Sequence, residues 1–247
     1  MKYYCFITVR SSSTRLKKKC FLNFGSITVL EHIILRCIYG GLLPVICTTE
    51  KVADKKIIKL AKIMNIKYFQ GSEKNKIFRW YECSKKFKIN NFHTIDADDL
   101  FFDWDAVKKS MQVLKKTKKD VVLPSKVSRE GGASEGYSFT RFGLEKMIKE
   151  YKFLRSKNAD IEMIDRFLVN LNKKTLNGHN YQIKKVRLTL DYIEDYYLFK
   201  KIRDKLGNFS HRKKINSFLK KNFNLSKINY FRNEEWSKRQ LKIISRT

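Results

Sequence analysis

The first group of residues that could do chemistry lies directly after a short apolar run near the start of the chain. Residues 3–7 are aromatic and β-branched, which is typical of a buried strand. The segment 8–19 follows, with three consecutive serines and three widely spaced cations, Arg10, Arg15 and Lys19. Backbone N–H groups of such a segment can converge on an anion while the cations approach from the sides, which suits a triphosphate. The segment lacks the Gly-x-x-x-x-Gly-Lys pattern of the common phosphate-binding loop, and a basic, solvated connection explains its composition equally well.

Carboxylates form the second group, again at the end of an apolar run. Residues 92–95 lead into Asp96, Asp98 and two further acids, and a second apolar run, 185–190, ends on Asp191. Asp96 and Asp98 are two residues apart and would point the same way on an extended chain. Carboxylates on one side can hold Mg²⁺ or Mn²⁺ against phosphate oxygens. A solvated Asp-rich turn or helix cap is the alternative, but the chain has 24 acids against 54 cations, so their concentration here favours function.

Strands and helices alternate along the first 200 residues and must position these groups. The periodicity predicts strands at 42–47, 66–69, 92–95, 120–124, 137–140 and 185–191, and helices at 29–37, 56–64, 77–87, 105–116, 143–151, 160–171 and 194–202. Ser26 would cap the first helix. This alternation predicts an α/β fold, a Rossmann-like three-layer α/β/α arrangement with a mostly parallel sheet. Ligands of such sheets bind at the carboxyl ends of strands, so the two groups should meet there.

Two departures from this alternation divide the chain. The segment 129–136 is rich in Gly and Ser, and it could be a lid, a substrate-specificity loop or a plain surface connection. Residues 207–247 are basic and less apolar than the rest. We therefore expect an α/β domain at 1–206, and a C-terminal extension at 207–247 that packs over the domain or at a subunit interface.

Composition restricts the class of protein. The chain has 247 residues, of which 43% are apolar and 13% aromatic, as expected of a folded protein. Its five cysteines and four histidines lack the spacing of a disulfide framework or zinc site. It lacks both the roughly 18 consecutive apolar residues of a membrane span and a signal-peptide pattern, so we expect a cytoplasmic protein. The net charge of +30 would suit a nucleic-acid binder, but the lysines are dispersed and the Lys, Ile and Asn richness is typical of AT-rich genomes, which disfavours nucleic acid as the partner.

Taken in order, these residues resemble the cytidylyltransferases that activate acidic sugars as CMP-sugars, most closely the spore-coat polysaccharide (SpsF-like) branch of the acylneuraminate and Kdo enzymes. The branch opens with a strand and Arg-Met-x-Ser-x-Arg-Leu-Pro-x-Lys, which is matched here by Arg10, Ser13, Arg15, Leu16 and Lys19. Further matches are residues 29–33, 71–72, 79–81, 96–100, 188–195 and 229–234. Three family prolines are replaced, by Lys17, Leu100 and Ile193, and Asp96 stands where the family has Thr.

The resemblance implies a nucleotide-diphospho-sugar transferase-like fold and a nucleotidyltransferase that joins CTP to a Kdo- or sialic-acid-like sugar, with release of pyrophosphate, for surface polysaccharide synthesis. It implies Mg²⁺ or Mn²⁺ held by Asp98 and Asp191, and catalytic roles for Arg15, Lys19 and Asp98. We expect nucleotide contacts from Arg10, Ser11, Ser12, Ser13, Thr14, Thr48, Gly71 and Asp96. We expect sugar contacts from Arg79, Glu135, Gly136, Tyr137 and Asn233. A homodimer is suggested by the resemblance and by the C-terminal arm.

Other functions stay open from the sequence. Asp96-Ala97-Asp98 is an Asp-x-Asp, the pattern of metal-dependent glycosyltransferases (GT-A type) that use a nucleotide-sugar, although such enzymes do not need cations for a leaving triphosphate. A non-enzymatic polyanion or nucleic-acid binder would use the net charge, but no helix-turn-helix, finger or aromatic stacking motif is evident. An inactive transferase homologue is a further alternative, because the family prolines are lost.

Overall fold

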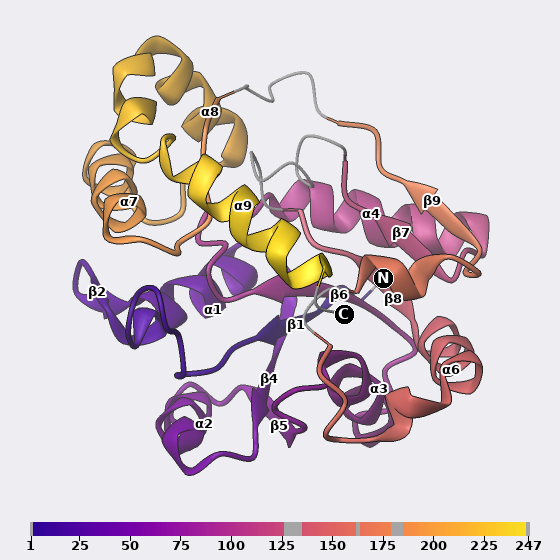
Figure 1. The fold of residues 1–247 in the computed structure, drawn as a ribbon. Helices are drawn as coiled ribbons and strands as arrows, with labels where there is room; N and C mark the ends of the chain where they lie inside the picture. Colours follow the sequence, from indigo (N-terminus) through magenta and orange to yellow (C-terminus); the bar gives the residue numbers. More distant parts are fainter. Residues whose placement is uncertain (1, 126–134, 162–163, 179–184, 246–247) are drawn as a thin grey trace.

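Seven strands form one central sheet with helices on both of its faces (Figure 1). The computed structural model describes residues 2–125, 135–161, 164–178 and 185–245, with side chains as far as residue 238. The part of the expected lid at 129–134 lies outside the described residues. The strands are β1 Tyr4–Thr8, β4 Leu43–Thr49, β5 Lys67–Gly71, β6 Asn91–Asp96, β7 Val121–Leu123, β8 Ser138–Thr140 and β9 Lys173–Thr175. A separate hairpin pairs β2 Asn23–Phe24 with β3 Ile27–Thr28.

The sheet has the order β5-β4-β1-β6-β8-β7-β9 and is mostly parallel. β1 pairs in parallel with β4 and β6, and β4 with β5, whereas β8 is antiparallel to both of its neighbours. The helices are α1 Val29–Tyr39, α2 Lys55–Ile63, α3 Lys76–Lys86, α4 Trp104–Thr117, α6 Arg141–Glu150, α7 Ile193–Leu206, α8 Arg212–Lys221 and α9 Arg232–Ser245. The predicted three-layer α/β/α class with a mostly parallel sheet is confirmed.

Apolar side chains of the strands alternate between two buried layers. In β1, Cys5 and Ile7 pack into the layer beneath α1, α7 and α8, and Phe6 packs into the layer beneath α3 and α6. This alternation follows from the two-residue period of a strand, and burial on both faces explains why the central strands read as continuous apolar runs. All five cysteines are buried in these layers as free thiols.

The first helix begins differently from the prediction. Thr28, not Ser26, is the N-cap of α1: its hydroxyl accepts a hydrogen bond from the Glu31 N–H at 3.3 Å. The Glu31 carboxylate accepts in return from the Thr28 N–H at 2.6 Å. This reciprocal pair is a capping box, for which Ser26 lies two residues too early.

Two predicted elements later in the chain are also wrong. Residues 185–191 do not form a strand; Leu190 N–H donates to the carbonyl of Asp98 at 2.8 Å, and the apolar side chains pack into the layer beneath α7 and α8. The segment 160–171, predicted as an α-helix, contains the 3-10 helix Asp165–Leu168 in its described part. In both cases tertiary packing overrides a local periodicity.

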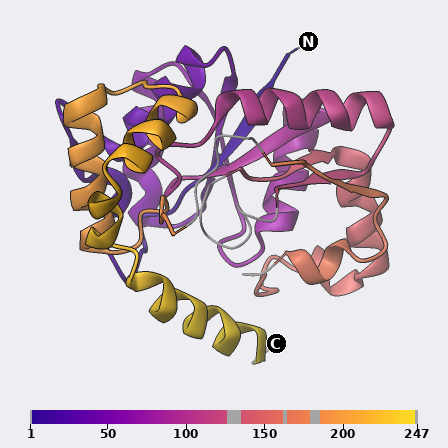
Figure 2. The ribbon, with the colours of Figure 1, turned by 90° about the horizontal axis from the view of Figure 1, so that it is seen from above.

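The C-terminal part packs onto the α/β core and then extends from it. Ile215 and Leu219 of α8 join the same buried cluster as Leu198 and Phe199 of α7. α9 extends from this part, in front of the edge at which the parallel strands end (Figures 1 and 2). Among the described residues, no helix combines the length and apolarity that crossing a bilayer would require.

Two buried histidines make the stability of this fold sensitive to acid. Burial lowers the pKa of His32 in α1 to about 3, with the Arg36 charge adding to the effect. Burial also lowers the pKa of His93 in β6 to about 4. The ring nitrogens of His93 lie 2.8 Å from Ser138 Oγ and 2.6 Å from the carbonyl oxygen of Glu135, so the neutral ring is held in place.

Acidification from about pH 7 to about pH 5 is therefore expected to destabilise the protein, by about 2 kcal/mol for each histidine. The unfolded chain binds a proton near pH 6.5, whereas the folded chain does not until its lower pKa is reached, so stability falls across that interval. Urea unfolding at the two pH values measures the change. The variant His93→Asn, which removes one of the titrating groups, should show a shallower dependence on pH; an unchanged dependence would contradict the assignment.

Candidate functional site

The predicted residues meet at the carboxyl edge of the sheet. Parallel pairing of β1 with β4 and β6 brings the segment 9–19, the end of β4 and the turn 96–99 to this edge. The segment 187–191 joins them through the backbone bond between Leu190 and Asp98. The prediction that the basic segment and the acidic cluster face each other is therefore met by the topology.

Lys19 lies between the two carboxylates that were predicted to hold a metal. Its ammonium nitrogen is 2.7 Å from Asp98 Oδ2, 3.1 Å from Asp191 Oδ1 and 2.9 Å from the carbonyl oxygen of Leu190. Burial lowers the pKa of Lys19, but the charges of Asp98 and Asp191 outweigh this and raise it overall. Three oxygens from two chain segments thus surround one cationic centre.

Asp191 is a buried carboxylate of the site, with its side chain 2% exposed. Arg15 Nη2 lies 2.5 Å from Asp191 Oδ1, and Arg187 Nη2 lies 2.8 Å from Asp191 Oδ2. Burial alone would raise the pKa of Asp191, but Lys19, Arg15 and Arg187 outweigh it, and the pKa is lowered overall. Asp191 is therefore held ionised, and it holds Arg15 and Lys19 in place.

Arg187 connects this carboxylate to the C-terminal helices. It is fully buried, and its Nε lies 3.0 Å from Asp195 Oδ1 and its Nη1 3.2 Å from Asn233 Oδ1. Asn229 donates to the same Asp195 oxygen at 2.8 Å. Asn233, predicted to contact the sugar, is thus bonded to an internal arginine at the start of α9. The sequence analysis gave Arg187 no site role, although an arginine inside the alternating apolar pattern at 186–190 was an available signal. It named Asp195 and Asn229 only within segments that match the family, without a role in the site.

The acidic turn places three carboxylates together. Oxygens of Asp96, Asp98 and Asp99 lie within 4.8 Å of one another. Asp96 is exposed, but nearby protein atoms remove part of its hydration, which raises its pKa, and the charge of Lys76 opposes the rise. Mg²⁺ and Mn²⁺ prefer oxygen ligands, so these residues fit a hard divalent cation. Asp98 belongs to this cluster and also contacts Lys19.

The basic segment itself is anchored by Asp54, in the short 3-10 helix between β4 and α2. Ser11 donates to Asp54 Oδ1 through its N–H at 2.8 Å and its hydroxyl at 2.6 Å, and the Thr49 hydroxyl bonds to the other oxygen of the buried Asp54. The Ser11 N–H is therefore directed at a carboxylate of the protein. Arg10, Ser12 and Thr14 are exposed in the same irregular segment, and Ser13 is half-buried. Asp54 had not been predicted, because nothing local links it to position 11.

Thr48, Gly71 and Arg79 lie together near the ends of β4 and β5. The Thr48 hydroxyl is buried, and it has no hydrogen-bond partner in the part of the chain that the structure describes. A Cβ on Gly71 would lie 2.7 Å from the Phe69 ring and 3.1 Å from Arg79 Cγ, so the glycine permits close packing of that arginine. Arg79 donates to the Ser72 carbonyl oxygen at 2.6 Å, and burial lowers its pKa.

Glu135, Gly136 and Tyr137 line the side of β6. Glu135 accepts from the Ser125 N–H at 2.7 Å. The Tyr137 carbonyl oxygen accepts from the Thr94 N–H at 2.8 Å, and the Tyr137 N–H donates to the Thr94 hydroxyl at 3.0 Å. Gly136 has φ +58°, and a Cβ there would lie 2.0 Å from the Thr94 carbonyl oxygen. These contacts hold the segment against the sheet; direct contact with a sugar stays a prediction for all three residues.

Replacing Gly136 by Ala is expected to reduce the free energy of unfolding by about 3 kcal/mol, since both the left-handed backbone and the contact with Thr94 oppose a side chain. Gly207→Ala is the matched control, because Gly207 has φ +83° with nothing within 4 Å of its Cβ position. It should cost only about 1 kcal/mol. Equal costs in denaturant unfolding would show that the contact with β6 is unimportant.

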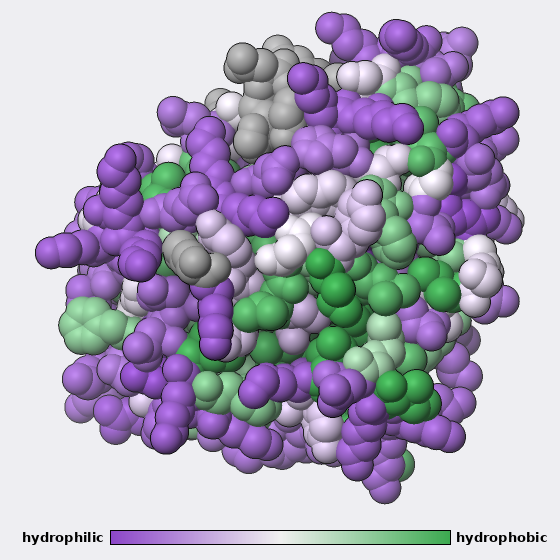
Figure 3. Space-filling model, turned by 180° about the vertical axis from the view of Figure 1, so that it is seen from behind, coloured by the Kyte–Doolittle hydropathy of each residue, from purple (hydrophilic) through white to green (hydrophobic). Residues whose placement is uncertain are grey.

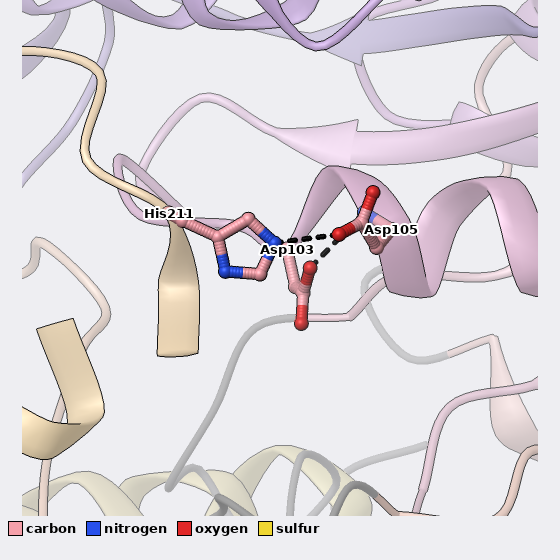
Figure 4. Close-up of side chains that lie close together, drawn as sticks. All are labelled: Asp103, Asp105 and His211. Atoms are coloured by element: carbon pink, nitrogen blue, oxygen red, sulfur yellow. Dashed lines mark hydrogen bonds and ion pairs between the residues drawn. The ribbon is translucent and has the colours of Figure 1, made fainter. Parts of the chain in front are cut away.

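A second group of potential ligands lies away from this edge. Asp103, Asp105 and His211 bring their ligand atoms within 4.8 Å of one another (Figure 4). His211 Nδ1 accepts from the Lys213 N–H at 3.1 Å, so in the neutral ring Nε2 carries the proton, which it donates to Asp105 at 2.5 Å. Metal-bound histidines usually donate through the other nitrogen instead. The group therefore ties the start of α8 to the start of α4.

Comparisons with known proteins define the fold of the chain. No protein-family model matches it. An uncharacterized protein of Methanocaldococcus jannaschii is 29% identical over 238 residues, which are 93% of this chain and 95% of the relative. A cytidylyltransferase from Leptospira borgpetersenii serovar Hardjo-bovis has a similar structure, with a TM-score of 0.79 at 22% identity over 91% of this chain and 96% of the other.

Two further solved structures share the architecture at lower similarity. CMP:2-keto-3-deoxy-manno-octonic acid synthetase, solved with CTP, has a TM-score of 0.62 at 12% identity over 83% of this chain and 99% of the other. UDP-glucose pyrophosphorylase, solved with UDP-glucose, has a TM-score of 0.57 at 14% identity over the same shares. The chain has the Rossmann-like fold of the nucleotide-diphospho-sugar transferases.

Proposed function

We propose that the protein is a cytoplasmic nucleotidyltransferase that transfers CMP from CTP to an acidic sugar and releases pyrophosphate. The observation that carries the proposal is the meeting of Arg15, Lys19, Asp98 and Asp191 at the carboxyl edge of the sheet. Cations there suit a triphosphate, and the carboxylates suit the cation that accompanies it. Similar structures include one named as a cytidylyltransferase and one solved with CTP, which supports this choice of nucleotide.

A divalent cation would be held at Asp98, with either Asp191 or Asp96 as its second carboxylate. Three oxygens surround the Lys19 ammonium, so a cation can be bound at or beside this position. The Asp96–Asp99 cluster adds further oxygen donors. When bound, Mg²⁺ or Mn²⁺ would neutralise charge on the phosphates and orient them. One structural neighbour, Rv0371c from Mycobacterium tuberculosis, was solved with manganese, which is consistent with such a requirement.

The reaction proposed is an in-line displacement at the α-phosphorus of CTP. A hydroxyl oxygen of the sugar forms the new P–O bond, its proton is lost to solvent or a carboxylate, and the bond to the bridging oxygen breaks as pyrophosphate leaves with the electron pair. Arg15 and Lys19 would stabilise the negative charge that builds up on the pyrophosphate. Positioning and fixed charge supply most of the acceleration in transfers of this kind.

The base and the sugar would lie on either side of these phosphates. Thr48 and Gly71, at the ends of β4 and β5, would contact the nucleotide; the buried Thr48 hydroxyl has no hydrogen-bond partner among the described residues. Arg79 and the segment 135–137 are the proposed sugar side, and an eight- or nine-carbon keto acid is the substrate that the family resemblance implies. A role in surface polysaccharide synthesis and a homodimer rest on that resemblance alone.

Thermal unfolding with Mg²⁺ and each of CTP, UTP, ATP, GTP and UDP-glucose tests the proposal. A ligand at 100 times its Kd should add about 2.7 kcal/mol of stability, so a shift selective for CTP and enhanced by Mg²⁺ is expected. Pyrophosphate release in the presence of acidic sugars then identifies the acceptor. Selective stabilisation by UDP-glucose would favour the glycosyltransferase alternative. Equal shifts with every polyanion would show that the site binds anions without specificity and would contradict the proposal.

A further inference from the structure

The edge of the sheet opposite the candidate site is strongly basic. Because β1, β4, β5 and β6 are parallel, their first residues and the ends of the helices that precede them share this edge. Exposed lysines on it include Lys62, Lys67, Lys85, Lys86, Lys115 and Lys116. We call the surface formed by these strand starts and helix ends the amino-edge face.

Helix α4 lies lengthwise along this face. The amide nitrogen of Gln112 donates to the hydroxyl of Tyr3 at 2.9 Å, and Lys108 lies beside Gly41 at the start of β4. Figure 2 shows α4 lying along the same side of the molecule as the amino terminus. The exposed positions Lys109 and Lys116 are two turns apart on this helix, so its outer surface is basic along its length.

Helix-end stabilisation does not account for all of these lysines. Cations in the last turn of a helix interact favourably with its dipole, which explains those at the ends of α3 and α4. Lys88 and Lys118, however, follow those helices with φ of 54° and 51°, where Gly or Asn is the usual residue. Lys2 and Lys67 are not in helices. Lysines therefore occur on this face even at positions whose left-handed backbone favours Gly or Asn.

Acids do not offset this charge. Among the described segments 2–3, 38–43, 62–67, 85–91, 105–121 and 140–142, the acids are Asp105 and Asp120. Asp105 is bonded to His211 at 2.5 Å, and Asp120 to Lys146 at 2.8 Å. The acids of the candidate site lie at the opposite edge, so the described residues of this face include no comparable group of carboxylates.

Apolar side chains are exposed on the same face. Ile38 and Tyr39 at the end of α1, Leu43 at the start of β4 and Ile63 at the end of α2 are all exposed, Ile63 by 71%. Figure 3, seen from behind, shows an apolar patch surrounded by hydrophilic side chains. A face that serves only solubility would not gather such residues in one place.

We propose that the amino-edge face docks the protein on an anionic lipid bilayer, with Ile38, Leu43 and Ile63 entering the headgroup region and the surrounding lysines contacting the lipid phosphates. Basic side chains around a shallow apolar patch are the combination that peripheral binding to anionic membranes requires. Nucleic acid fits less well, because Ile38, Leu43 and Ile63 offer the bases no stacking surface, and the ring of Tyr39 is already stacked on Phe209, with ring centroids 5.3 Å apart. In this orientation the candidate site faces away from the bilayer.

Co-sedimentation of the full chain with vesicles tests the proposal. Binding is expected to vesicles of phosphatidylcholine mixed with phosphatidylglycerol and not to phosphatidylcholine alone, and it should weaken with salt. Lys115→Gln with Lys116→Gln should lower the partition coefficient on the order of 25-fold, about fivefold for each lysine. The matched control is Lys55→Gln with Lys56→Gln, which removes the same charge at the other edge, at the start of α2.

The apolar contribution has its own matched pair. Ile63→Ser should reduce binding without changing the charge, whereas Val52→Ser, at a site 75% exposed near the carboxyl edge, should not. Equal losses in the two lysine variants would show that net charge alone drives adsorption, and equal effects of Ile63→Ser and Val52→Ser would show that the apolar patch has no specific role; either result would overturn the proposal. Failure to bind anionic vesicles would overturn it too, as would tighter binding to a single-stranded RNA that is lost in the same amino-edge variants.

Discussion

Replacing Asp98 by Asn is expected to lower the rate of pyrophosphate release from CTP by about a thousandfold or more. The amide has the size of the carboxylate, and its oxygen can still accept a hydrogen bond from Lys19, whose ammonium nitrogen lies 2.7 Å from Asp98 in the unaltered protein. The substitution removes the negative charge of Asp98, which both contacts Lys19 and contributes to the Asp96–Asp99 cluster. Release is measured with CTP, Mg²⁺ and the acceptor identified by screening. The far-UV circular dichroism spectrum and the free energy of unfolding should stay close to those of the unaltered protein, because Asp98 is partly exposed.

The control for this variant is Asp105→Asn. Asp105 is also an exposed aspartate close to other potential ligands, but it is bonded to His211 and lies away from the carboxyl edge. It should retain full activity. An Asp98→Asn enzyme that turns over at the original rate would remove both the catalytic and the metal-binding role from this residue.

Replacing Arg187 by Met is expected to lower the free energy of unfolding by about 3–5 kcal/mol. Arg187 is fully buried and pairs with both Asp191 and Asp195, so its loss leaves two buried carboxylates with fewer partners. It also removes the bond to Asn233 at the start of α9. Urea unfolding monitored by fluorescence measures the loss.

Lys238→Met provides the comparison for a surface pair. Lys238 and Glu234 are 2.7 Å apart, but their side chains are 70% and 76% exposed. Solvent screening should make the cost of this change much smaller than that of Arg187→Met. If Arg187→Met costs no more than the surface variant, the buried network does not hold the 187–191 segment in place.

The parallel sheet could be predicted because its strands are buried on both faces and read as apolar runs separated by amphipathic helices. The meeting of the 10–19 segment with Asp98 followed from the same reasoning, since the ends of parallel strands share an edge. These inferences need only local periodicity and one topological rule. They did not require any knowledge of which side chains touch.

The parts that could not be predicted depend on contacts between distant segments. Asp54 bonds to Ser11, and Arg187 bonds to Asn233, across separations that no local pattern reports. The segment 185–191 has the alternation of a strand, but its apolar side chains pack beneath α7 and α8 and its backbone pairs with a turn. The position of Lys19 between Asp98 and Asp191 likewise follows from the assembled fold, in which one cation meets carboxylates from two segments.

The burial of all five cysteines has a practical consequence for spectroscopy. Each thiol lies in one of the two apolar layers, and burial raises the pKa of Cys5, Cys20 and Cys83, which keeps these sulfurs in the unreactive protonated form. Maleimide dyes and nitroxide reagents should therefore find no native target while the chain is folded. A single cysteine introduced at Lys118 could carry a fluorophore or spin label without first removing the native ones, and its signal would report the polarity and water exposure of that surface directly.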